Sequence, residues 1–170
     1  MTINTDINIL GGLPDFNLVL HFLENPEPSG NKDHQTFSTI KTTKAVKRFR
    51  HTILKSLLSF PNPDAEILVK TSLWGEGISK DTLMLLFWVF SFNNELMHHL
   101  NRSVLFPALF SGRTGISYEE VKACLWELRQ TEADLKKWSE ETLSTTASKY
   151  LTILVKFGIL EGSAHKSIPT

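Results

Sequence analysis

Hydrophobic side chains recur at helical spacing along most of the chain. Apolar residues three and four positions apart predict helices over about 16–23, 39–60, 64–73 and 81–102, followed by a shorter piece over 103–110 that Pro107 interrupts. The same spacing predicts two further helices, over 117–130 and 139–157. No strongly alternating strand pattern precedes the C-terminus. The fold class expected from this pattern is all-α, mostly helical.

Capping residues and glycines mark the expected ends of these helices. Ser79 and Ser139 stand where side chains cap helix N-termini, and Gly158 stands where a C-terminal cap is expected. Ser117 and Glu120 have the spacing of a capping box, in which each side chain bonds the other residue's backbone N–H.

Glycines at 75 and 77 suggest a boundary within the chain. We expect an N-terminal helical subdomain over 1–77, which contains a basic helix, and a C-terminal subdomain over 78–170; the two can pack as one unit.

The C-terminal subdomain has the element order of a winged helix-turn-helix. Between residues 116 and 162 come a helix, a polar link, a second helix, a glycine and the extended apolar pair Ile159-Leu160, which leaves room for at most a small β wing. In such a module the second helix enters the DNA major groove. Its candidate contact residues are Ser139, Thr142, Thr145, Thr146 and Lys149.

Two features of this second helix limit that interpretation. Glu140 and Glu141 at its start repel phosphates, although they suit the positive end of the helix dipole. The alternative is that the polar residues cap and pack a helix whose module binds another protein. With no arginine placed to read guanine, any DNA binding is expected to be weakly sequence-specific.

The charge of the chain is balanced overall but unevenly distributed. The 18 basic and 18 acidic residues cancel, yet residues 34–63 carry six Lys or Arg and no acid, whereas residues 1–33 carry five acids and one Lys. On the helix over 39–60, basic residues lie opposite Val46, Phe49, Ile53 and Leu57. The candidate nucleic-acid-binding residues of this helix are Lys41, Lys44, Lys47, Arg48, His51 and Lys55.

A basic face of this kind offers several charges to a phosphate backbone. The alternative is an ordinary solvated helix, but such a helix usually interleaves acids with its lysines. Arg50 lies nearer the apolar side, where it can extend along the surface to reach water.

No catalytic or metal-binding pattern is found in the sequence. Cys124 is the single cysteine, which excludes a disulfide framework and a cysteine-rich zinc site. The six histidines show no metal-ligand spacing, and the glycines show no phosphate-loop spacing. We therefore expect no catalytic residue, no metal, no cofactor and no small-molecule substrate, and hence not an enzyme.

Two segments bear on the expected compartment. Residues 1–6 lack the basic start of a secretory signal, and the apolar run over 83–92 is about half the length of a bilayer-spanning helix. We expect a cytoplasmic protein without a membrane partner, in which the apolar run is a buried core helix.

The aromatic side chains are expected to form core contacts. They lie within apolar helix patterns at Phe87, Trp88, Phe90, Phe92, Phe106 and Phe110. Trp126 and Trp138 are expected to pack the two C-terminal helices together.

The C-terminal residues resemble a known family. The run Leu135-Lys136-Lys137-Trp138-Ser139-Glu140-Glu141-Thr142, followed by Leu151, Leu154 and Phe157-Gly158-Ile159-Leu160, is similar to the C-terminal signature of the BrxA family, the small helical component of BREX phage-resistance systems. Counted broadly, the resemblance spans residues 35–162, and the last 30 or so are the specific part.

The resemblance implies an all-helical fold with helix-turn-helix character. It further implies binding to double-stranded DNA and action beside other defence proteins in a bacterial cytoplasm, without catalysis. Two alternatives stay open: a protein-protein adaptor within a defence complex, and an RNA-binding factor like the NusB antitermination proteins.

Overall fold

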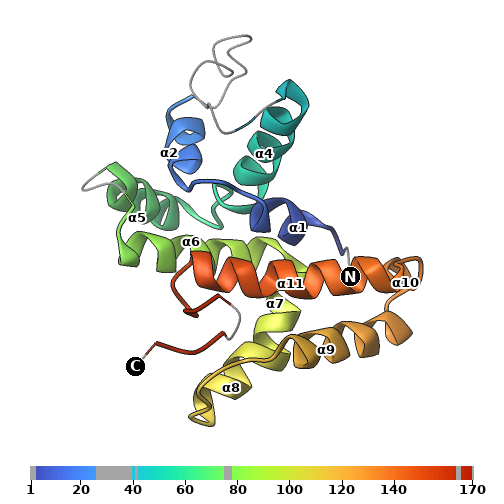
Figure 1. Ribbon diagram of the computed structural model, residues 1–170. Helices are drawn as coiled ribbons and strands as arrows, with labels where there is room; N and C mark the ends of the chain where they lie inside the picture. The colour runs from blue at the N-terminus through green and yellow to red at the C-terminus, as the bar shows by residue number, and fades with distance from the viewer. Residues whose placement is uncertain (1–2, 26–39, 41, 75–77, 164–165, 170) are drawn as a thin grey trace. The chain divides into compact units, whose positions relative to one another are not determined.

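The computed structural model describes residues 3–25, 40, 42–74, 78–163 and 166–169 (Figure 1). These residues are mostly helical, which confirms the all-α expectation. The chain forms two compact units, one of Gly12–Asn93 and the other of Met1–Gly11 with Asn94–Thr170. We call them the inserted unit and the terminal unit. The boundary expected at residue 77 lies outside the described residues.

The inserted unit contains four described helices. They are α2 (Asn17–Glu24), α4 (Thr43–Ser56), α5 (Pro63–Trp74) and α6 (Lys80–Asn93). Helix α4 packs against α2 and α6, and α5 packs against α6. The amide of Asn93 donates hydrogen bonds to the backbone oxygens of Ser56, at 3.3 Å, and Ser59, at 2.7 Å, so the end of α6 is tied to the end of α4.

The terminal unit is organised around one long helix. Its elements are α1 (Asp6–Gly11), α7 (Glu95–Leu100), the π-helical turn η1 (Asn101–Leu105), α8 (Phe106–Phe110), α9 (Tyr118–Thr131), α10 (Ala133–Lys136) and α11 (Glu140–Lys156). Helix α11 packs against both α1 and α9 (Figure 1). Fully buried Tyr150 of α11 donates a hydrogen bond from its hydroxyl to Oδ1 of Asn101, at 2.9 Å.

The expected caps are confirmed. The side chains of Ser79, Ser117 and Ser139 each accept a backbone N–H from three residues further on, at 3.1 Å. Gly158 ends α11 with a φ of 73°, a conformation that favours glycine. The capping box is complete, because the Glu120 carboxylate accepts the backbone N–H of Ser117; the same carboxylate also pairs with Arg113, which the sequence did not predict.

The single helix expected over 81–102 is wrong. Asn94 has an extended backbone, with φ −130° and ψ 107°, and its side chain accepts the backbone N–H of Met97 at 2.8 Å. This asparagine therefore caps a new helix, and α6 and α7 are separate.

Helices α1 and α10 were not expected. Each is short, at 6 and 4 residues, and therefore shows little helical periodicity. Near the C-terminus, Ser167 forms antiparallel bridges with both Glu161 and Gly115, the only strand-like pairing among the described residues.

Several aromatic side chains expected in the core are exposed. Phe87 and Phe90 are buried, but Trp88 is 41% exposed, Phe92 68% and Phe110 88%. Trp138 is buried, whereas Trp126 is 45% exposed and lies under the guanidinium of Arg129. The apolar run over 83–92 is thus buried on one side only. No helix within the described ranges combines the length and apolar character needed to cross a bilayer.

Candidate nucleic-acid interface

Helix α4 forms because an apolar stripe and a cap support it. The hydroxyl of Thr42 accepts the backbone N–H of Ala45 at 3.2 Å, which satisfies one donor at the helix start. Val46, Phe49 and Ile53 recur at helical spacing and are buried. The opposite side of α4 is therefore left to solvent.

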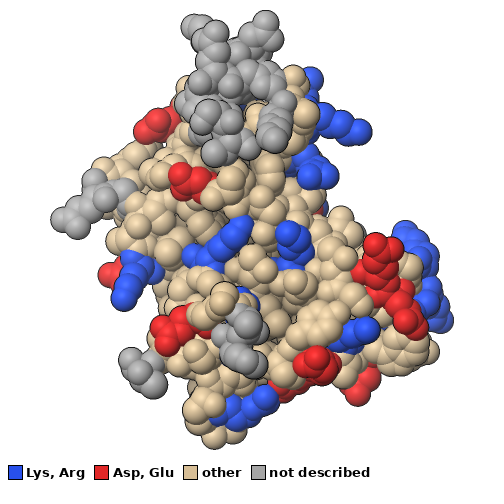
Figure 2. Space-filling view, in the orientation of Figure 1, with Lys and Arg blue, Asp and Glu red and all other residues tan. Residues whose placement is uncertain are grey.

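The basic residues of α4 that the structure describes lie on that exposed side. Figure 2 shows Lys and Arg side chains over α4 at the upper right of the molecule. The segment Thr43–Ser56 itself contains no acidic residue. The residues exposed are Lys44, Lys47, Arg48, His51 and Lys55, which we call the α4 cationic face; Lys41 lies outside the described residues.

Arg50 does not belong to this face. Its side chain is 8% exposed, donates a hydrogen bond to the backbone oxygen of Asn25 at 3.1 Å, and lies over the ring of Phe22. This arginine therefore links α4 to the end of α2 and does not extend to solvent.

In helix α11, the expected contact residues do not share one accessible face. Ser139 is the N-cap, and its hydroxyl lies 3.0 Å from that of half-buried Thr142. Thr145 is exposed, but Thr146 is fully buried and accepts a hydrogen bond from the amide of Asn8, at 3.2 Å. The expectation that Thr146 contacts nucleic acid is wrong, because α1 covers it.

Lys149 is also close to α1. A Cβ atom placed on Gly11 would lie only 2.9 Å from Cβ of Lys149, so the two helices approach closely at this glycine. About two turns further along α11, Nζ of Lys156 donates to the backbone oxygen of Gly11 at 3.0 Å. Burial, and secondarily the charge of Lys149, lower the pKa of Lys156. Helix α1 thus occupies the side of α11 that carries Thr146, Lys149 and Lys156.

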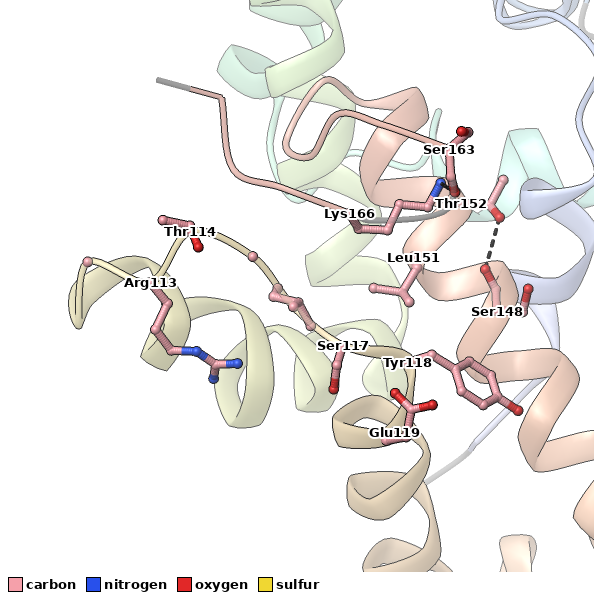
Figure 3. A pocket seen from close by; sticks show the side chains of 13 residues that line it. Arg113, Thr114, Ser117, Tyr118, Glu119, Ser148, Leu151, Thr152, Ser163 and Lys166 are labelled. Carbon is pink, nitrogen blue, oxygen red and sulfur yellow. Dashed lines mark hydrogen bonds between the residues drawn. The ribbon is translucent and has the colours of Figure 1, made fainter.

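A different side of α11 is open. Glu141, Thr145 and Ser148 are exposed and Thr152 is half-buried, and their spacing places them on one side of the helix. Ser148 and Thr152 line an open pocket of about 960 Å³ (Figure 3). Sequence reasoning missed these two residues, although the recurrence of hydroxyls at 145, 148 and 152 is a visible helical stripe.

The other walls of the pocket come from the start of α9 and from the C-terminal segment. Figure 3 shows Ser117, Tyr118 and Glu119 at one end, and Ser163 and Lys166 at the other. The Lys166 amine donates to the backbone oxygens of Gly162, at 2.7 Å, and Ser163, at 2.6 Å. These bonds hold the amine beside the pocket.

Arg113 lines the pocket but is engaged elsewhere. Its guanidinium makes a bidentate pair of hydrogen bonds with the Glu120 carboxylate, in which Nη2 lies 2.6 Å from Oε2. This pairing lowers the pKa of Glu120 and raises that of Arg113. With Glu119 also in the lining, the pocket has little net positive charge, in contrast to the α4 cationic face.

Cys124 is the single cysteine of the chain. Burial raises the pKa of the half-buried Cys124 thiol, which disfavours the nucleophilic thiolate. Among the described residues, no three His, Cys, Asp or Glu side chains gather as metal ligands would.

The geometry defines a mostly helical protein with two separate polar surfaces, one cationic and one rich in hydroxyls. No protein family, no characterised protein and no solved structure matches the chain.

Proposed function

We propose that this protein is a non-catalytic, double-stranded DNA-binding accessory protein of a bacterial phage-defence system of the BREX type. The observation that carries DNA binding is the α4 cationic face. Five basic or titratable side chains are exposed on one helix that has no acid.

The dimensions of this face suit a polyanion. Lys44 and Lys55 are eleven residues apart, which is about 16 Å along a helix. Duplex DNA carries one negative charge per about 1.7 Å of its axis, so a face of this length can meet several phosphates. Each neutralised phosphate releases counterions, and this release favours binding at low salt.

The element order of the terminal unit supports a winged helix-turn-helix. Helices α9 and α11 follow one another across the short α10, and the chain after α11 returns to form the Glu161–Ser167 bridge. Ser167 also bridges to Gly115, which lies three residues before the start of α9. A short paired turn after the second long helix is where the wing of such a module lies.

The defence role rests on the resemblance of residues 135–160 to the BrxA family. It implies a cytoplasmic protein that acts beside other defence proteins. A methyltransferase gene and a large ATPase gene next to this one would support the assignment. Their absence from the neighbourhood of this gene would count against it, without affecting DNA binding.

A protein-protein adaptor is the second candidate, and exposed aromatic side chains favour it. Trp88 and Phe92 lie one turn apart on α6, with ring centroids 6.3 Å apart, and both are exposed. Aromatic side chains of this kind are enriched at protein interfaces. An adaptor can use them while the α4 cationic face binds DNA or an acidic partner.

Charge reversal on α4 tests DNA binding. We expect the double variant Lys44→Glu/Arg48→Glu to bind duplex DNA at least about tenfold more weakly than the wild type in fluorescence anisotropy at about 50 mM salt. The matched control is Lys136→Glu/Lys137→Glu, which makes the same change of net charge at two exposed residues of the terminal unit. Equal weakening by both variants would mean that only net charge matters, and would contradict a role for α4.

Structured RNA is the competitor in the same assay. Unlabelled duplex DNA is expected to displace the labelled duplex from the protein at a lower concentration than structured RNA does. Stronger displacement by RNA would contradict the DNA assignment and favour the RNA-binding alternative.

A further inference from the structure

The pocket of the terminal unit has an unusual lining. Apolar lining comes from Ile116 and Leu151, both of which are buried. Most of the rest is glycine, one amine and a set of hydroxyl groups from three segments of the chain. The hydroxyls belong to Thr114, Ser117, Tyr118, Ser148, Thr152 and Ser163.

This composition does not suit an enclosed small molecule. Pockets for small molecules are mostly apolar and bury most of the ligand surface. Here Ser117, Ser148 and Ser163 are themselves exposed, so a ligand would remain in contact with water. Hydroxyls, amines and helix N-termini are the groups with which proteins commonly bind the phosphates and sugars of nucleic acids.

Several donors of the pocket are open to a ligand. The hydroxyl of Ser117 accepts the Glu120 N–H, which leaves its own O–H available to donate. The hydroxyl of Thr152 is already bonded to the backbone oxygen of Ser148, at 2.9 Å, whereas the Ser148 hydroxyl projects from the exposed side of α11. Lys166 has three N–H donors, and two of them reach Gly162 and Ser163.

We infer that phosphodiester groups of a DNA backbone bind in this pocket, with the hydroxyls of Ser148 and Ser117 and the amine of Lys166 as hydrogen-bond donors. The inference rests on the proposed function and adds a second contact site to it. It also moves the contact face of α11 from the side covered by α1 to the side that carries Thr145, Ser148 and Thr152.

The two sites differ in the interactions through which they would bind DNA. The α4 cationic face acts mainly through counterion release, which depends steeply on salt. In the pocket, Glu119 and the Arg113–Glu120 pair leave little net charge, so Ser148 and Ser117 contribute neutral hydrogen bonds. Removing such a bond changes affinity while leaving the salt dependence unchanged.

Substitutions at Ser148 test the inference. We expect Ser148→Ala to weaken duplex binding by about three- to tenfold, the effect of one lost hydrogen bond, with the same slope of log affinity against log salt as the wild type. Ser148→Glu is expected to weaken binding more strongly, because a carboxylate would face the phosphate. Circular dichroism melting of each variant verifies that α11 is folded.

The matched control is Thr131→Glu. Like Ser148, Thr131 is an exposed helical residue of the terminal unit, but it lies at the end of α9 and does not line the pocket. Its hydroxyl donates to the backbone oxygen of Leu128 in its own helix. Weakening by Ser148→Glu that exceeds that of Thr131→Glu by at least about tenfold supports the pocket. Equal affinities for these two variants would overturn it.

The outcomes for the two sites are separable. Suppose that the wild type binds DNA, that Lys44→Glu/Arg48→Glu weakens this binding, and that the Ser148 variants leave it unchanged. The pocket inference then fails, and the proposed function stands. If the wild type does not bind duplex DNA even at about 50 mM salt, the proposed function fails and the pocket inference fails with it.

Discussion

Tyr150 illustrates what local sequence patterns cannot show. Its hydroxyl is fully buried and depends on Asn101, which lies 49 residues earlier in the π-helical turn η1. Burial raises the pKa of this phenol well above its ordinary value, so the hydroxyl stays neutral and donates a hydrogen bond to Asn101. The apolar pattern of α11 predicted that position 150 is inside, but not its polar partner.

Removal of this hydroxyl is expected to destabilise the terminal unit. Tyr150→Phe deprives a buried amide oxygen of a donor, so we expect a loss of about 1–2 kcal/mol in the free energy of unfolding, measured with urea. Tyr118→Phe, at a half-buried residue, is the control and should change stability little. If Tyr150→Phe had the same free energy of unfolding as the wild type, the stabilising role of the Tyr150–Asn101 hydrogen bond would be contradicted.

Other residue-scale features could be predicted because they are local. Ser79, Ser117 and Ser139 cap helices as their spacing indicates, and Gly158 adopts the expected positive φ. The additional pairing of Glu120 with Arg113 could not be predicted, because Arg113 lies before the helix and its charge-assisted, bidentate hydrogen bond depends on how the residues between them fold.

At the scale of elements, α4 and α11 show the difference between local and distant determinants. The exposed side of α4 was predicted from the sequence, because the positions of Val46, Phe49 and Ile53 on one side determine which side is buried. The accessible side of α11 was not, because α1 lies more than 130 residues away in sequence, as the Asn8–Thr146 bond shows. A six-residue helix gives no periodic signal of its docking site.

The docking of α1 on α11 gives a prediction at this scale. Gly11→Ala would place a methyl group 2.9 Å from Cβ of Lys149 and 3.1 Å from its backbone oxygen. We expect a loss of about 1–3 kcal/mol in the free energy of unfolding, the usual cost of overpacking.

Amide hydrogen exchange locates the effect of this substitution. Faster exchange is expected in α1 and in the part of α11 around Thr146 and Lys149. Unchanged stability together with unchanged exchange would contradict the close approach of the two helices.

At the scale of the whole molecule, the chain leaves one compact unit after Gly11 and returns to it at Asn94. The two units divide the chemistry: the α4 cationic face belongs to the inserted unit, and the hydroxyl-lined pocket belongs to the terminal unit. Helical composition could be predicted from periodicity. The grouping of the first eleven residues with the C-terminal part could not, because it depends on contacts between distant segments.

This division predicts how substitutions combine. Residues that share no partner usually have additive effects, within about 0.5 kcal/mol. The variant Lys44→Glu/Arg48→Glu/Ser148→Ala is therefore expected to lose the sum of the two binding free energies that its parts lose separately. A loss no larger than that of the charge reversal alone would show that the pocket contributes nothing to the same complex.

The salt dependence of duplex binding by the wild type tests the central claim most directly. If the α4 cationic face neutralises three to five phosphates, log affinity should fall with log salt with a slope of about −3 to −4.5. Lys44→Glu/Arg48→Glu should bring this slope closer to zero by about 2. A wild-type slope near zero, or one that the charge reversal leaves unchanged, would contradict the account.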